Sequence, residues 1–154
     1  VAAPQPQPAP PVAVGLADVI QSAQQWLGVP YSFGGCSARG VDCSCLVQLV
    51  YRAVGVNLPR VASDQWNATA RLSREDLQPG DLVFFANTYM PGISHVGIYI
   101  GNGLQINAPT TGDVVSVAPV FTGYWGAHYA GAGRVRSPGA CGPPSPPLAA
   151  RCAA

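Results

Sequence analysis

Charged residues are scarce in this 154-residue chain, where they make up 10% of the composition and leave a formal net charge of only +1. Lysine is absent, so arginine alone supplies the basic side chains. A protein that follows the phosphates of a nucleic acid, or lies on an anionic membrane, needs a basic face that this composition does not provide. We therefore expect no nucleic-acid partner.

Long apolar runs are missing as well. No stretch of the sequence approaches the roughly 20 consecutive apolar residues of a membrane-spanning helix, so we expect no transmembrane segment. The N-terminus also lacks a basic stretch followed by an apolar one, which predicts a mature form without a signal peptide.

Proline is concentrated at the two ends of the chain. Residues 1–15 are rich in Pro, Ala and Gln and carry no charge, which is typical of an extended segment. Residues 137–154 form a similar Pro-rich C-terminal tail. Between them, residues 16–136 have the length and apolar content of one domain with its own core.

Two stretches of this core show helical spacing. Residues 16–28 place apolar side chains on one face and are followed by a helix stop at Gly28 and Pro30. Residues 42–55 predict a second helix, with Asp42 as its cap and Gly55 at its end. The expected buried positions are Leu16, Ile20, Ala23 and Leu27 in the first helix, and Leu46, Val47, Val50 and Val54 in the second.

The pattern changes to β after residue 80. Short apolar runs bounded by Gly, Pro, Asn and Asp predict strands, and "GNG" at 101–103 predicts a hairpin turn. Helices followed by strands favour an α+β fold, with an antiparallel sheet and helices packed on one side. The runs lie at 82–86, 94–100, 104–108, 114–120 and 131–136.

Cys43 follows the predicted cap residue and so lies in the first turn of the second helix. Unpaired N–H groups and the positive end of the helix dipole favour an anion there, and they can lower a thiol's pKa into the roughly 3.5–7.5 range. The same N–H groups can receive an oxyanion. The alternative is that Cys43 is a small buried hydrophobe.

A nucleophilic thiol needs a base, and the chain has two histidines. His95 opens an apolar β run, and Asn107 follows on the next predicted strand across the hairpin. Facing positions on adjacent strands lie about 5 Å apart, so Asn107 is placed to hold the imidazole in one tautomer. The alternative is a structural sheet histidine beside an Asn at a strand end.

Several short motifs occur in order along the core, namely "PYSFGG", "DCSCLV", "LPR", a Gln, "PGDLVFF", "HVGIYIGNG" and "INAP". Over roughly residues 16–136 they resemble the NlpC family of bacterial cell-wall cysteine endopeptidases. The resemblance implies a papain-like α+β fold, with N-terminal helices on a central antiparallel sheet of about five to six strands. It also implies a secreted or cell-envelope bacterial enzyme that hydrolyses peptidoglycan stem peptides, commonly between D-γ-glutamyl and a diamino acid.

The same resemblance assigns roles to individual residues. Cys43 matches the nucleophile, His95 the base and Asn107 the third polar residue, which is most often His in the family. Tyr31 matches a tyrosine that lines the active site, although it also fits a packed aromatic before a turn. Asp42 and Ser44 match positions that contact the substrate, and the Asp42 carboxylate can serve as helix cap as well.

The chain departs from the family pattern at Cys45, where Gly or Ala is usual, and at Ala62, where Ser or Thr is frequent. Wall-binding modules commonly accompany the catalytic domain, and here only the Pro-rich segments do. Hydrolysis by a cysteine nucleophile with a histidine base needs no metal or other cofactor. We expect the protein to be a monomer.

Five cysteines leave one unpaired if the others form disulfides. Cys43 and Cys45 point about 200° apart on one helix, so they can neither share a metal nor bond to each other. Our hypothesis is that Cys141 pairs with Cys152 and Cys36 with Cys45, which leaves Cys43 free. The alternatives are a buried, reduced Cys45 and unpaired cysteines in the tail.

Three functions remain open at this level. The first is a peptidoglycan peptidase, the second an amidase or acyltransferase with a different amide or ester substrate on the same scaffold, and the third a non-catalytic wall-binding domain. We assign no chemical role to His128, and we expect the three tryptophans, Trp26, Trp66 and Trp125, to belong to the core.

Overall fold

Two helices form where the apolar spacing predicts them. In the computed structural model, which describes residues 15–136, α1 spans Leu16–Gln24 and buries Val19 and Ala23. The prediction that Leu27 lies on the buried face is wrong, because the helix ends before it and Leu27 is exposed in the following turn.

The second helix, α2, spans Cys43–Arg52 and begins at the predicted cap. The Asp42 side chain accepts a 2.8 Å hydrogen bond from the backbone N–H of Cys45, which satisfies one free donor of the first turn. The chain leaves the helix region through Gly55, whose φ of 91° is accessible to glycine at little cost. Leu46, Val47 and Val50 are fully buried.

The strands form one sheet of six strands in the order β3-β8-β4-β5-β6-β7, with every neighbouring pair antiparallel. The predicted α+β class is confirmed. A separate two-stranded sheet lies in the loop between α1 and α2. The strands are β1 Cys36–Ser37, β2 Gly40–Val41, β3 Thr69–Leu72, β4 Leu82–Ala86, β5 Ile93–Gly101, β6 Leu104–Asn107, β7 Ser116–Pro119 and β8 Tyr129–Val135.

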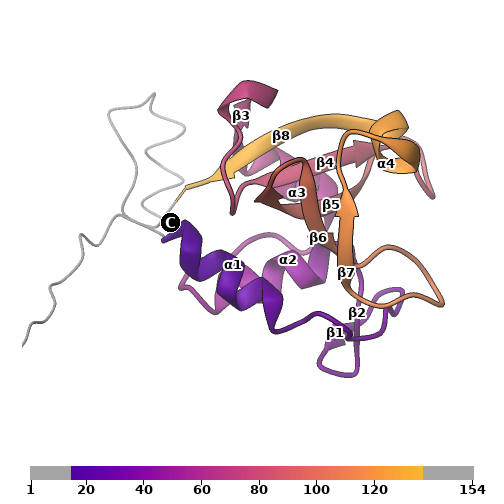
Figure 1. Cartoon of the computed structure of the whole chain (residues 1–154). Helices are drawn as coiled ribbons and strands as arrows, with labels where there is room; N and C mark the ends of the chain where they lie inside the picture. Colours follow the sequence, from indigo (N-terminus) through magenta and orange to yellow (C-terminus); the bar gives the residue numbers. More distant parts are fainter. Residues whose placement is uncertain (1–14, 137–154) are drawn as a thin grey trace, which may run out of the picture.

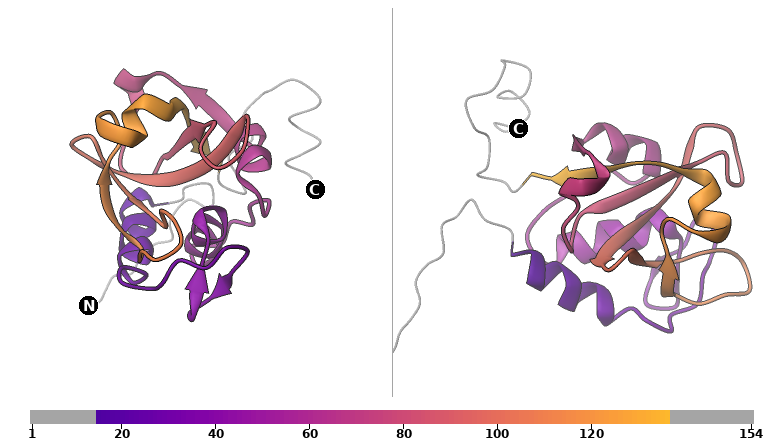
Figure 2. Two further views of the ribbon diagram at one scale, coloured as in Figure 1. Left: turned by 90° about the vertical axis from the view of Figure 1, so that its right-hand side faces the viewer. Right: turned by 45° about the horizontal axis from the view of Figure 1, so that its top comes forward.

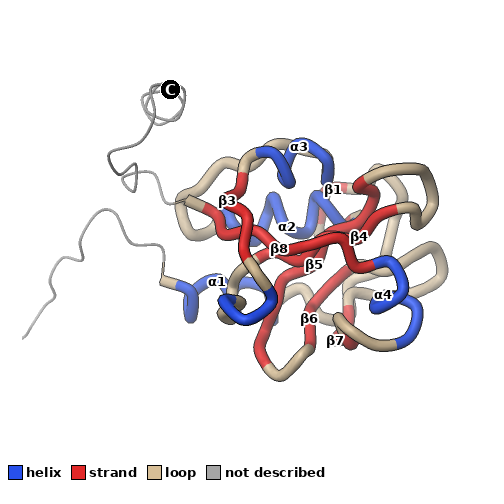
Figure 3. Tube along the Cα trace, turned by 90° about the horizontal axis from the view of Figure 1, so that it is seen from above, coloured by secondary structure: helices blue, strands red, loops and turns tan. Residues whose placement is uncertain are grey.

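Three short helical segments and β3 were not predicted from the sequence. They are α3 (Ala62–Asn67), the 3-10 helix η1 (Arg74–Asp76) and α4 (Gly123–His128). Each is too short to show apolar periodicity. The views in Figures 1 and 2 place α1 and α2 together below the sheet, and Figure 3 shows α4 at the opposite end of the molecule from α1.

The sheet separates two apolar clusters. The larger one lies between the sheet and the helices and joins Leu46 and Val50 of α2 to Val96 and Ile98 of β5. The smaller one lies on the other face and contains Phe85, with Trp125 of α4 packed against it. Along β4, Phe84 belongs to the larger cluster and its neighbour Phe85 to the smaller one. Successive side chains of a strand point to opposite faces of the sheet, which explains this alternation.

The β5–β6 connection is a tight hairpin, as "GNG" predicts. Asn102 and Gly103 have φ angles of 55° and 75°, the left-handed values that a two-residue hairpin loop needs. None of the helices within residues 15–136 has the length and apolar character needed to cross a membrane. The proposed Cys141–Cys152 pair and most of the Pro-rich segments lie outside the described residues, and the domain bounds stay a prediction.

Candidate active site

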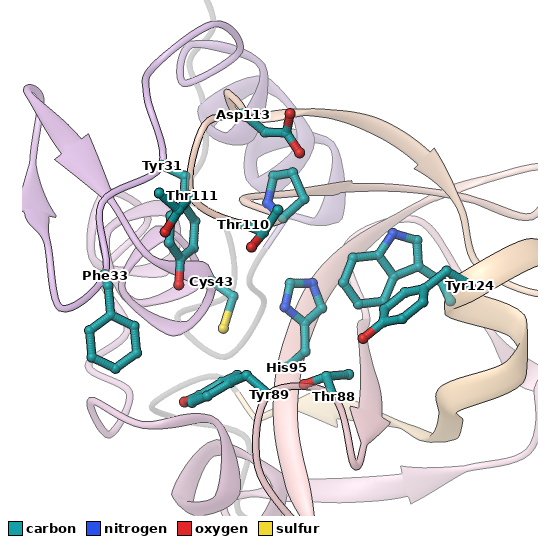
Figure 4. A pocket seen from close by; sticks show the side chains of 12 residues that line it. Tyr31, Phe33, Cys43, Thr88, Tyr89, His95, Thr110, Thr111, Asp113 and Tyr124 are labelled. Atoms are coloured by element: carbon teal, nitrogen blue, oxygen red, sulfur yellow. The ribbon is translucent and has the colours of Figure 1, made fainter.

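Cys43 begins α2 and lies against the start of β5. Its side chain is only 6% exposed, and its sulfur is 4.0 Å from the backbone carbonyl oxygen of Ser94. Figure 4 shows the sulfur turned toward an open space that it shares with the His95 ring and the hydroxyl end of Tyr31. The predicted nucleophile therefore lies at the floor of a cleft.

Burial raises the pKa of the Cys43 thiol to about 11, the opposite direction to that expected from the helix dipole. Nearby backbone N–H groups, including those of Val96 and Ser44, act to lower the pKa, but desolvation outweighs them and the Asp42 charge adds to it. The thiol is thus uncharged at neutral pH in this structure. The sequence-based expectation was wrong because it considered the helix end and not the packing above it.

His95 and Asn107 meet on one face of the sheet. The Asn107 Nδ2 atom is 3.0 Å from the His95 Nε2 atom, and both side chains are buried. The pairs Ile98–Ile106 and Tyr99–Gln105 set the register, which puts Asn107 opposite Gly97 and diagonal to His95. Direct facing of His95 and Asn107 was the wrong register, but the two side chains still share a face.

Gly97 makes this diagonal contact possible. A Cβ atom at Gly97 would lie 1.9 Å from the Gln105 Oε1 atom and 3.3 Å from the Asn107 Cβ atom. The absence of a side chain therefore leaves room for Gln105 and Asn107 between His95 and Tyr99.

Trp125 covers the imidazole. Its ring stacks on the His95 ring with centroids 4.1 Å apart and an interplanar angle of 16°. His95 also contacts Phe85, with centroids 5.6 Å apart, and is 3% exposed. This burial lowers the pKa of His95 to about 3, so the ring is neutral at pH 7.

This role of Trp125 is not visible in the sequence, because no local pattern pairs residues 95 and 125. Trp26 and Trp66 pack against the helix-side cluster, as expected. His128 lies with its Nδ1 atom 2.9 Å from the Ala86 carbonyl oxygen, a contact within the fold.

The cleft has two parts, one on each side of Cys43. The His95 chamber has a volume of about 550 Å³ and is walled by His95, Trp125 and the loop after β6. The Asp42 chamber has a volume of about 340 Å³ and contains Asp42, Ser44 and Arg60. Four residues line both chambers, namely Tyr31, Phe33, Cys43 and Tyr89.

The charges of the Asp42 chamber are paired. The Arg60 guanidinium forms a two-pronged ion pair with Asp42, at 2.8 and 3.1 Å, and also donates to the Ser44 hydroxyl at 3.0 Å. Arg60 belongs to the quoted "LPR" motif, yet the sequence alone assigned it no role. Asp42 thus caps α2 and binds the Arg60 guanidinium at the same time.

Tyr31 and Phe33 lie on the loop before α2. Burial is the main cause that raises the pKa of Tyr31 to about 12, so its hydroxyl remains a hydrogen-bond donor at neutral pH. The exposed Phe33 ring meets the Tyr89 ring edge-on, with centroids 5.9 Å apart. These two aromatic side chains border the cleft beside Cys43 (Figure 4).

A disulfide joins Cys36 to Cys45 and ties the loop that carries Tyr31 and Phe33 to α2. Within residues 15–136, Cys43 is the free cysteine. No group of three or more His, Cys, Asp or Glu side chains in that part of the chain is arranged to hold a metal ion.

Comparison with known proteins relates the chain to one family. Residues 28–134 match the model of the NlpC/P60 family. The gamma-DL-glutamyl hydrolase of Bacillus subtilis (strain 168) is 43% identical over 115 residues, which cover 73% of this chain and 28% of the relative. The murein DD-endopeptidase MepH of Escherichia coli (strain K12) is 41% identical over 118 residues, which cover 74% of this chain and 44% of the relative.

A solved structure of an NlpC/P60 family protein from Bacillus cereus superimposes with a TM-score of 0.73 and 35% identity. The match covers 84% of this chain and 41% of that one. The chain therefore spans less than half the length of each of these three relatives.

Proposed function

The chain belongs to the NlpC/P60 family, and from this premise we propose that it is a cysteine peptidase that hydrolyses an amide bond in peptidoglycan stem peptides. The bond between D-γ-glutamyl and a diamino acid is our first candidate. One observation carries the proposal: Cys43 from the helical layer and His95 from the sheet line the same cleft, and the buried Asn107 is hydrogen-bonded to His95.

The first step transfers one proton and forms one bond. Asn107 engages the His95 Nε2 atom, so Nδ1 is the nitrogen left to take the Cys43 proton. For this tautomer the Asn107 carbonyl oxygen accepts from Nε2–H, which a 180° turn of the amide provides. Because both groups are neutral at rest, the thiol loses its proton to His95 as sulfur attacks the carbonyl carbon.

The start of α2 supplies donors for the resulting oxyanion. The N–H of Cys45 is used by the Asp42 cap, whereas those of Cys43 and Ser44 belong to the free donors of the first turn. Both lie close enough to the Cys43 sulfur to act on its pKa. We assign the oxyanion to these two groups.

The remaining steps restore the enzyme. The His95 imidazolium donates its proton to the leaving nitrogen as the C–N bond breaks, and a thioester remains on Cys43. Water then attacks the thioester and gives a proton to His95, the C–S bond breaks to release the carboxylic acid, and His95 returns the proton to the Cys43 sulfur. Trp125 stacked on His95 favours the transient imidazolium through its π face.

Our proposals for the cellular location and the oligomeric state follow from the same family membership. An enzyme with this substrate acts in the bacterial envelope or outside the cell, and we propose a monomer. The amidase and acyltransferase alternatives use the same three residues, and no further observation favours either. A non-catalytic wall-binding domain has no need of a buried His–Asn pair beside a free thiol.

The test is mass spectrometry of defined muropeptides incubated with the wild-type chain and with Cys43→Ala. We expect cleavage by the wild type at the D-γ-glutamyl bond and none by Cys43→Ala. Cross-linked muropeptides, included in parallel, report cleavage of a DD bond instead.

Cys45 offers a matched control, because it is the neighbouring sulfur on the same helix. The Cys36→Ala/Cys45→Ala double variant keeps Cys43 and should retain measurable cleavage, although it releases the disulfide that ties the Tyr31 loop to α2. No cleavage of any muropeptide by the wild type would overturn the peptidase proposal. Equal cleavage by wild type and Cys43→Ala would overturn the role of Cys43.

A further inference from the structure

The two chambers of the cleft differ in the charge on their walls. In the Asp42 chamber the acidic and basic groups neutralise each other through the Asp42–Arg60 ion pair. In the His95 chamber the one carboxylate among the lining residues is Asp113, and no Arg lines this chamber with it. The larger chamber therefore carries uncompensated negative charge.

The mechanism decides which part of the substrate enters this chamber. His95 must reach the leaving nitrogen to protonate it, so the amine product lies on the His95 side of Cys43. The acyl part then lies on the other side, against Asp42 and Ser44. The residue that follows the broken bond accordingly enters the chamber that Asp113 lines.

Asp113 is held in place by its backbone. It lies in the loop between β6 and β7, where its carbonyl accepts a 2.9 Å hydrogen bond from the N–H of Tyr31 and its own N–H donates 3.0 Å to the Thr110 carbonyl. Its neighbour Val114 forms a bridge with Pro30. The loop is thus fastened to the segment that carries Tyr31.

Among residues 15–136, the Asp113 carboxylate has no ion-pair partner. The ion pairs of residues 15–136 engage Asp42 and Asp81, and Asp113 is solvent-exposed at the cleft wall (Figure 4). An exposed carboxylate on an anchored backbone, with no cation beside it among residues 15–136, can pair with a cation on the ligand without breaking an existing ion pair of those residues.

We propose that Asp113 selects leaving groups that carry a second, free ammonium group, such as the side-chain ammonium of a diamino acid. This inference rests on the proposed peptidase function and adds which stem peptides the site prefers. Stems in which that ammonium has been acylated, as happens on cross-linking, lose the charge that Asp113 recognises.

The test compares two substrates that differ at one atom group. L-alanyl-γ-D-glutamyl-L-lysine carries the free ammonium, and its Nε-acetyl derivative does not. We expect wild type to favour the free ammonium in kcat/KM by on the order of fivefold, the upper range for a partly exposed ion pair. Asp113→Asn should remove this preference by slowing only the charged substrate, and added salt should reduce it in the wild type.

Asp64→Asn serves as the control, because Asp64 is an exposed carboxylate on α3 outside both chambers. It should leave the preference unchanged. Cleavage of both substrates at equal rates by the wild type would overturn the inference while the peptidase function stands. An Asp113→Asn variant that slows both substrates equally would also overturn it, since Asp113 would then support the loop. Cleavage of neither substrate, nor of any muropeptide, would remove the peptidase proposal and this inference with it.

Discussion

The two faces of β5 have different roles, although the residues that point to them alternate along the same strand. Toward the helices, Val96 and Ile98 are fully buried among apolar side chains. Toward the other side, His95 lies under Trp125 and contacts Asn107, with Gly97 next to it. One strand therefore supplies both the core and the base.

This difference shows which contacts of the strand depend on exact geometry and which depend only on buried area. Apolar contacts gain free energy from the area they bury and tolerate small shifts. The His95–Asn107 contact depends on one nitrogen, one amide and a 3.0 Å distance in a place that excludes water. We expect substitutions on the first face to change stability, and substitutions on the second to change turnover.

The largest expected effect is on stability, from Ile98→Ala on the helix side. Ile98 is fully buried, so its truncation removes apolar contacts and leaves a cavity. We expect the free energy of unfolding to fall by about 2–5 kcal/mol, measured by urea denaturation. At a temperature where the variant stays folded, kcat/KM should remain within about twofold of wild type, because His95 faces away.

Val117→Ala is the matched control on the edge strand β7, since Val117 is 47% exposed. It should change the free energy of unfolding by less than about 0.5 kcal/mol. A fully folded Ile98→Ala variant with a large loss of turnover would contradict the division between the two faces.

The next effect is on turnover, from Gly97→Ala on the other face. The new methyl group would collide with the Gln105 Oε1 atom and crowd the Asn107 Cβ atom, so the amide that orients His95 must move. The 3.3 Å contact requires Asn107 to shift by a few tenths of an ångström. A misplacement of about 1 Å costs on the order of 10²-fold in rate, so we expect this smaller shift to lower kcat by about tenfold.

A second substitution tests the cause. Gln105→Ser in the Gly97→Ala background removes the atom that the methyl group meets first, and it should recover part of kcat. Loss of activity that is the same with and without Gln105→Ser would show that Gly97 acts by another route.

Local signals in the sequence found the elements that frame the site. The Asp42 cap, the Gly55 stop and the "GNG" hairpin depend on residues within one turn of each other, and all three are present. The structure also joins Cys36 to Cys45 and leaves Cys43 free among the described residues. The cap, the stop and the hairpin follow from short-range geometry. The Cys36–Cys45 pairing was a hypothesis, and the structure bears it out.

Contacts between segments that are distant in the sequence could not be predicted from such local signals. Trp125 stacks on His95 from 30 residues away, and no spacing rule connects an α4 residue to a β5 residue. Arg60 reaches Asp42 across the loop after α2, although "LPR" was visible in the sequence. The short α3 and α4 form through tertiary packing, so their sequences show no period.

The smallest expected effect is that of His95 on the reactivity of the Cys43 thiol. Burial raises the pKa of Cys43 to about 11 and lowers that of His95 to about 3, so near pH 7 both groups are neutral. The thiolate fraction therefore rises about tenfold per pH unit up to about pH 11. Iodoacetamide labelling of Cys43, followed by mass spectrometry, should rise with it and show no plateau between pH 5 and 8.

His95→Gln sharpens the comparison, because it keeps a polar side chain and removes the base. Since a neutral imidazole does not stabilise a thiolate, labelling at pH 7 should differ by less than about threefold between this variant and wild type, while hydrolysis should fall by about 10²–10⁴-fold. A small thiol of ordinary pKa, labelled in parallel, gives the reference rate. A labelling plateau below pH 7 that disappears in His95→Gln would mean that a thiolate–imidazolium pair exists at rest. In that case the helix dipole, worth up to about 2 kcal/mol, and the imidazolium charge together would outweigh burial at Cys43.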